Sequence, residues 1–109
     1  MNLEMTWGEA PTWNIAVSLP EGTSLEGRKL IFTVRVEGAM IRKTSDPGGG
    51  ILITNAATGA ATLTIAREDT TALENKNYAR CPFDLWLDNA PTALVSGFMR
   101  IRAAITETL

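Results

Sequence analysis

The sequence predicts an all-β domain, a single antiparallel β-sandwich of immunoglobulin-like or jelly-roll-like type. Short segments alternate apolar and polar residues with a period of two, and turn-forming residues separate these segments at roughly ten-residue spacing. No segment carries the roughly 10–12 residues of helical periodicity that an α/β fold needs. The length of 109 residues suits one domain with its own core. We expect about six to eight strands and at most one short helix, near residues 67–74.

Two strands are predicted in the first third of the chain. The stretch WNIAVSL places Trp13, Ile15 and Val17 on one face, and the turn-rich PEGTSLEG follows it. The next stretch, LIFTVRVEG, places Phe32 and Val34 on an inward face and is rich in β-branched residues. We therefore expect these five side chains to lie in the core.

The middle of the chain predicts a short strand, a loop, a hairpin and a helical turn. AMIRK can pair back on the preceding strand, and the glycine-rich TSDPGGG is an exposed loop. ILITN and AATLTIA form a hairpin around AATG, with Leu63 and Ile65 in phase as core residues. REDTTALEN is the only plausible helix, two turns at most, with Leu73 as its apolar anchor.

The last two strands are predicted in RCPFDLWL and LVSGFMRIRAAI. In the first, Cys81, Phe83 and Leu85 share the apolar face, and in the second Met99 and Ile101 do the same. Proline lacks the N–H that a sheet needs and is tolerated at an edge, a bulge or a strand start. The proline at position 82 therefore allows the true strand to begin near Phe83.

The N-terminal segment leaves two alternatives open. In MNLEMTW the residues Leu3, Met5 and Trp7 are in phase, which is typical of a first strand of the sheet and also of an arm that pairs with a neighbouring molecule. We divide the chain into an arm or edge strand at residues 1–12, the sandwich at 13–105 and a C-terminal tail at 106–109.

Two aromatic residues fall out of phase with the core. Trp86 and Phe98 alternate with apolar neighbours, so on adjacent strands both rings would lie on the outer face. Such a pair marks a subunit contact, a platform for a sugar ring, or a surface covered by a loop or by the N-terminal arm. The candidate assembly interface therefore consists of Leu3, Met5, Trp7, Trp86 and Phe98.

The sequence predicts no catalytic residue, metal site or cofactor, and hence no enzyme. Histidine is absent, so Cys81 has no imidazole to activate it, and its phase makes it a core residue. Asp84 and Asp88 would lie about 13 Å apart along a strand, beyond the spacing of a glycosidase carboxylate pair. DPGGG is followed by neither Lys-Ser/Thr nor a helix, so it lacks the parts of a phosphate-binding loop.

Charge and hydropathy restrict the partners. A net charge of −2 and an isoelectric point near 5.0 give no reason to expect nucleic acid as a partner. No apolar run approaches the roughly 18 residues that span a bilayer, so we expect no membrane insertion. The first residues lack the basic and apolar regions of a secretion signal, and we expect synthesis in a cytoplasm.

Four stretches of the chain occur in a recognisable order, namely LEGRKLIFTVRVEG, ATGAATLTIAREDTTAL, NYARCPFDLWLDN and LVSGFMRIR. Over roughly residues 13–105, this order resembles a family of small β-sandwich modules in tailed bacteriophages, found in baseplate and tail-fibre adaptor proteins. In this family the motifs are packing and turn features. The residues that match them are Gly59, Thr62, Leu63, Ile65, Asp69, Thr70, Leu73, Tyr78, Asp84, Leu85, Gly97, Met99 and Ile101.

The resemblance implies a structural protein of the virion, made in the host cytoplasm, that binds copies of itself and other virion proteins. A capsid decoration protein is one alternative, and a carbohydrate-binding β-sandwich that contacts a glycan is another. The step from Tyr78 to Asp84 is longer than the two-residue step of the family, which puts the strand start in question.

Overall fold

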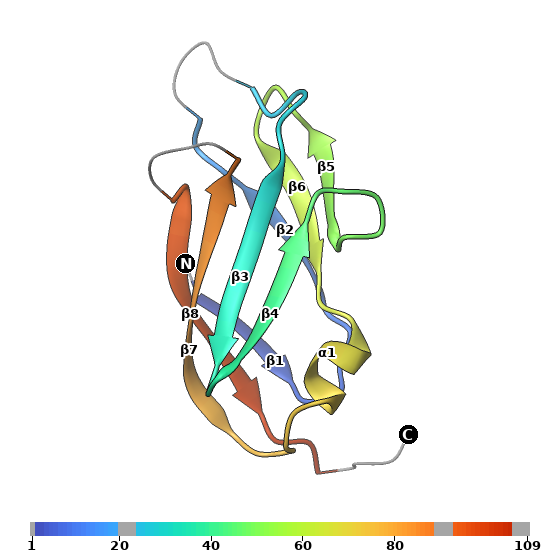
Figure 1. The fold of residues 1–109 in the computed structure, drawn as a ribbon, viewed down its shortest axis with the longest axis vertical. Helices are drawn as coiled ribbons and strands as arrows, with labels where there is room; N and C mark the ends of the chain where they lie inside the picture. The colour runs from blue at the N-terminus through green and yellow to red at the C-terminus, as the bar shows by residue number, and fades with distance from the viewer. Residues whose placement is uncertain (1, 20–23, 89–92, 106–109) are drawn as a thin grey trace.

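The computed structural model describes residues 2–19, 24–88 and 93–105, and in it two β-sheets face each other (Figure 1). The expected C-terminal tail at 106–109 lies outside these residues. The five-stranded sheet has the order β1 (Asn2–Thr6), β8 (Val95–Arg102), β7 (Tyr78–Leu87), β3 (Leu30–Val36), β4 (Ala39–Thr44). The three-stranded sheet has the order β2 (Thr12–Ala16), β6 (Ala60–Thr64), β5 (Ile51–Asn55). With one short helix, α1 (Arg67–Thr71), this confirms the all-β sandwich.

The core lies between the sheets and follows the alternation along each strand. In β3, for example, Leu30, Phe32, Val34 and Val36 are all buried. Trp13 is only half-buried and packs against the edge of this core. The other predicted core residues are buried: Ile15, Val17, Phe32, Val34, Leu63, Ile65, Cys81, Phe83, Leu85, Met99 and Ile101.

The N-terminal segment is an edge strand of this molecule and not an arm reaching to another. β1 pairs with β8, with Leu3 opposite Met99 and Met5 opposite Ile101. This pairing is parallel, whereas every other pairing between described strands is antiparallel. A parallel neighbour is possible here because β1 and β8 lie at opposite ends of the sequence, so no tight turn has to join them.

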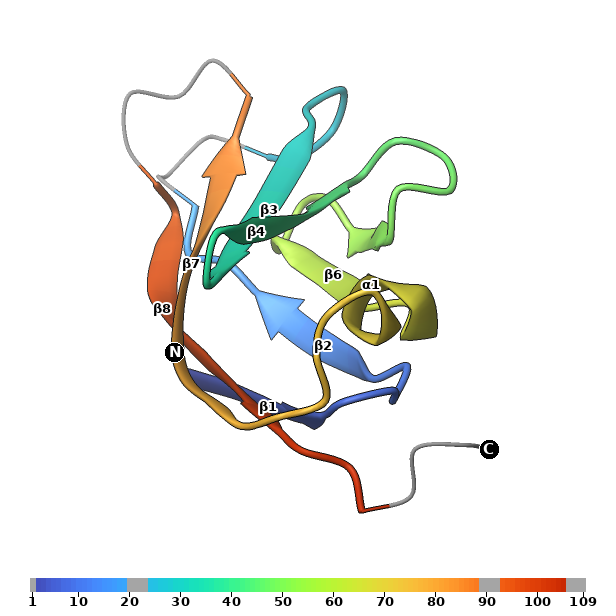
Figure 2. The ribbon, with the colours of Figure 1, turned by 60° about the horizontal axis from the view of Figure 1, so that its bottom comes forward.

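In Figure 2 the β3–β4 hairpin lies between β7 and β8 on its left and the strands β6 and β2 of the second sheet on its lower right. Its loop consists of Glu37 and Gly38, between the paired residues Val36 and Ala39. Both loop residues have positive φ, 49° and 97°, as a type I′ turn requires. This turn sets the register that places Thr33 opposite Arg42 and alternates inward and outward side chains on both strands.

The strand that contains the proline is longer than the sequence suggested. β7 begins at Tyr78 and not near Phe83, and a register shift between Tyr78 and Cys81 absorbs the extra residues. Pro82 lies opposite Phe98 on β8, while the pairing with β3 extends only as far as Phe83. The missing N–H of the proline therefore falls where β7 has left its β3 partner.

Candidate functional site

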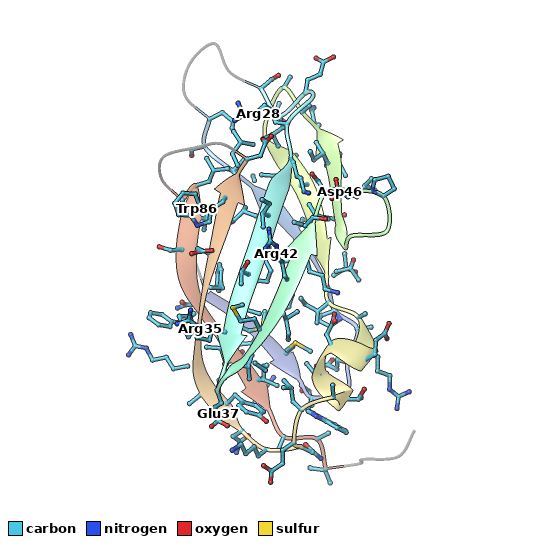
Figure 3. All side chains as sticks on the ribbon, in the orientation of Figure 1. Arg28, Arg35, Glu37, Arg42, Asp46 and Trp86 are labelled. Carbon is cyan, nitrogen blue, oxygen red and sulfur yellow. The ribbon has the colours of Figure 1, made fainter. Side chains whose placement is uncertain are left out.

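The outward side chains of the five-stranded sheet form the most distinctive surface of the described chain. Figure 3 looks onto this sheet, with Trp86, Arg42 and Arg35 labelled from its upper to its lower part. Five of the seven arginines of the sequence lie on this surface, which we call the arginine face. Its arginines, contributed by β3, β4, β7 and β8, are Arg35, Arg42, Arg80, Arg100 and Arg102.

Trp86 and Phe98 both lie on the arginine face, as their phase predicts, but they do not form one aromatic cluster. Phe98 is opposite Pro82, four positions along β7 from Trp86, which corresponds to about 13 Å. Trp86 is half-buried beside Ile31, whereas Phe98 is 38% exposed. The guanidinium of Arg80 lies over the Phe98 ring, 4.1 Å from its centroid, and forms a cation–π contact.

The three N-terminal candidates are held by their own domain. Leu3 and Met5 are buried in the core, which corrects their assignment to an assembly interface. Trp7 is half-buried against the core, and its indole N–H donates to the carbonyl of Leu73 at 3.0 Å. The cause is the pairing of β1 with β8, which turns this apolar stripe inward.

The arginines of this face are mostly without carboxylate partners. Of these five arginines, only Arg100 forms an ion pair within the described residues, with Glu4 at 3.7 Å, and both side chains are more than half exposed. Arg42 of β4 lies opposite Thr33 of β3, and Thr33 is two residues from Arg35 on β3. The two arginines are therefore diagonal neighbours, about 7–8 Å apart at the backbone, and both are exposed.

The lysines differ from these arginines in their ion pairs. Each of the three lysines in the sequence has an acidic partner. Lys29 contacts Asp46 at 2.8 Å, where its hydrogen bond lowers the pKa of the carboxyl. Lys43 contacts Asp69 at 2.5 Å. Lys76 lies 2.9 Å from Glu37, whose hydrogen bond raises the pKa of the ammonium group. None of these three lysines contributes to the arginine face.

A shallow hollow of about 190 Å³ lies in the arginine face across the consecutive strands β7, β3 and β4. It is smaller than the roughly 300–1,000 Å³ of a typical small-molecule pocket. Met40, 64% exposed, contributes an apolar wall. The residues that line the hollow are Thr33, Arg35, Met40, Pro82, Phe83 and Asp84.

Asp84 lies within β7 and Asp88 directly follows it, and the two aspartates have different roles. Asp84 lies on the arginine face, opposite Thr33 and Ser96. Asp88 accepts hydrogen bonds from the backbone N–H of Lys29 and from the guanidinium of Arg28, at 3.0 and 3.1 Å. These contacts, the backbone one first, lower the pKa of Asp88. Asp88 is thus a carboxylate that binds a backbone amide just after the end of β7.

The single cysteine lies in the core. Cys81 is 3% exposed, and burial raises the pKa of its thiol above the ordinary value. A buried thiol with a raised pKa is a poor nucleophile at neutral pH. Among the described residues there is no cluster of three metal-ligating side chains and no helix of the length and apolarity needed to cross a bilayer.

The shared surface of the arginines could not be predicted from the sequence. Alternation places Arg35, Arg100 and Arg102 on outward faces of their strands, yet it does not say which strands are neighbours. No protein-family model matches this chain, and no curated protein matches it.

Proposed function

We propose that this protein is a structural component of a bacteriophage virion, an adaptor of the tail, baseplate or tail fibre that acts through protein–protein assembly. Two lines of argument support the proposal. The motifs from LEGRKLIFTVRVEG to LVSGFMRIR resemble the adaptor modules of tailed phages. The molecule also presents a surface whose composition suits a protein interface.

The composition of the arginine face is the observation that carries this proposal. Protein interfaces are enriched in arginine, methionine and aromatic residues and depleted in lysine. The arginine face combines five arginines with Met40, Trp86 and Phe98, and it contains no lysine. We propose copies of this chain and other virion proteins as its partners, and the virion as its location.

The test of location is immunogold electron microscopy of particles from the phage that encodes this chain. We expect label at the tail, the baseplate or the fibres. Label on the capsid would support the decoration-protein alternative instead. Particles that carry no label, and whose mass spectra lack this chain, would contradict a structural role in the virion.

The test of assembly is the solution mass, measured by light scattering at several protein concentrations. We expect oligomers that dissociate when Phe98→Glu or Trp86→Glu places a carboxylate on the arginine face. Leu52→Glu is the matched control, because Leu52 is 66% exposed on the three-stranded sheet. Circular dichroism of each variant separates loss of assembly from loss of folding. A mass unchanged by both face variants would contradict this surface as the contact between copies.

Carbohydrate binding remains the second candidate, because Trp86 is a partly exposed ring on an open sheet face. Phe98 is a weak second platform, since Arg80 already covers its ring. This alternative predicts a monomer whose tryptophan fluorescence shifts with a glycan. Trp86→Ala would then stay folded and lose that shift.

A further inference from the structure

The charges of this protein are separated between its surfaces. The arginine face carries five arginines against two carboxylates, Glu4 and Asp84, which leaves three positive charges. The whole chain has a net charge of −2, so its remaining residues carry −5. Screening in physiological salt acts over about 8 Å, so a partner that contacts this face meets mainly the local positive field.

Two of the arginines on this face, Arg35 of β3 and Arg42 of the edge strand β4, lie close together, and Asp84 of β7 is the carboxylate on the neighbouring strand. The two arginines are diagonal neighbours on one face, and neither has an ion-pair partner among the residues that the structure describes. Like charges so close repel each other, and an anion between them removes that repulsion. Guanidinium groups also bind carboxylates through two parallel hydrogen bonds, which an ammonium group cannot do.

The surroundings of these two arginines favour a protein carboxylate over a nucleic-acid phosphate. Met40 lies opposite Arg35 in the β3–β4 pairing and is 64% exposed at the rim of the hollow. An apolar side chain of a partner can cover Met40 while neighbouring carboxylates reach the arginines. A nucleic-acid backbone carries a negative charge at every nucleotide, so the net negative charge of the chain and Asp84 on the same face oppose it more strongly than they oppose a segment with a few carboxylates.

We propose that Arg35 of β3 and Arg42 of β4, together with Met40 of β4, bind an acidic segment of a partner protein that carries apolar residues between its carboxylates. The inference rests on the proposed assembly function in one respect, because it takes the partner to be another virion protein. It adds the chemistry of that partner and the residues that recognise it.

The experiment is a titration of the ¹⁵N-labelled protein with a short peptide in which glutamates flank two leucines. The signals of the arginine Nε–H groups report directly on guanidinium contacts. We expect those of Arg35 and Arg42 to shift at low salt and to return toward their free positions at high salt. We expect the signal of Arg67, an exposed arginine on α1, to stay in place.

Variants make the assignment specific. Arg35→Gln and Arg42→Gln should each weaken peptide binding about fivefold, the equivalent of one exposed charge-assisted contact. Arg67→Gln changes the net charge equally and should leave the affinity within about twofold. Equal losses of peptide affinity in all three variants would show that binding depends on net charge alone and would overturn the proposal.

Two further probes separate other outcomes. The same peptide with glutamine in place of glutamate should not bind, and binding by it would exclude carboxylate recognition. An oligothymidylate that binds more tightly than the acidic peptide would assign the face to nucleic acid and overturn the inference. If the acidic peptide does not bind, the labelling of virions can still succeed. The two experiments therefore test the inference and the proposed function independently.

Discussion

The indole N–H of Trp7 donates a hydrogen bond to the carbonyl oxygen of Leu73, a residue 66 positions later in the chain. Next to it, the backbone N–H of Gly8 donates to the hydroxyl of the buried Thr70, at 2.9 Å. These two bonds join the end of β1 to the segment around α1. They hold the N-terminal strand to its own domain.

Replacing Trp7 by phenylalanine should destabilise the protein through the loss of this hydrogen bond. The ring stays aromatic and the carbonyl of Leu73 loses its donor, so we expect a decrease of about 0.5–1.5 kcal/mol in the free energy of unfolding. Urea denaturation followed by circular dichroism measures it. Trp13→Phe is the control, since Trp13 is also half-buried and its indole has no hydrogen bond within the described residues. Equal losses in the two variants would show that the Trp7 hydrogen bond contributes nothing of its own.

Asp88 should make the stability depend on pH in the acidic range. Its pKa lies below the ordinary value of 3.8 in the folded chain, because it accepts hydrogen bonds from the backbone of Lys29 and from Arg28. A carboxyl group with a depressed pKa stabilises the fold above its unfolded pKa and loses that contribution as the pH falls through the folded pKa. Asp88→Asn should therefore lower the urea midpoint at neutral pH.

The difference between the wild type and Asp88→Asn should begin to shrink as the pH falls below about 4, the ordinary pKa of an aspartate in the unfolded chain, and should be lost once the pH is below the depressed pKa of Asp88 in the folded chain. Glu26→Gln, at an exposed position, serves as the charge-matched control. A difference that stays constant between neutral and acidic pH would mean that the ionised carboxylate of Asp88 has no role in stability.

Gly59 should be the glycine least able to accept a side chain among those with positive φ. Its φ is +79°, and a Cβ atom there would lie 2.5 Å from the carbonyl oxygen of Val17. Gly27 has a similar φ of +69° and open space around the corresponding position. Gly27→Ala should cost about 1–2 kcal/mol for the left-handed conformation alone. Gly59→Ala should cost more, because the backbone of Val17 must also move; thermal denaturation of both variants compares them.

Cys81 should react with a thiol reagent only when the chain unfolds. The side chain is buried between the sheets and its pKa is raised, so the thiolate is scarce and enclosed. At mildly alkaline pH we expect slow labelling in buffer and rapid labelling in guanidinium chloride. Fast, stoichiometric labelling of the native protein would place the thiol at the surface and reopen the question of its reactivity.

Much of the fold was predictable because strand alternation is a local property. The inward phase of Phe32, Val34, Phe83 and Leu85 can be seen in a few consecutive residues, and burial follows it. The start of β7 was not predictable in the same way. The register shift before Cys81 depends on how β7 meets β8, about twenty residues away in sequence.

The candidate site was predictable only in its parts. The phase of Trp86 and Phe98 placed both on an outer face, but only the pairing of Phe98 with Pro82 shows that four positions separate the rings. The apolar stripe of Leu3 and Met5 looked equally suited to a neighbour or to a core. The pairing of β1 with β8 places both residues in the core.

By itself, then, the sequence determined the two-sided character of each strand, the absence of histidine chemistry and the outward direction of Arg35. Only the tertiary structure decided that Arg35 and Arg42 lie on one surface with the arginines of β7 and β8, while every lysine is paired elsewhere. The physical reason is the range of the forces involved. Alternation follows from the geometry of one extended backbone, whereas strand order depends on which distant segments bury the most apolar surface together.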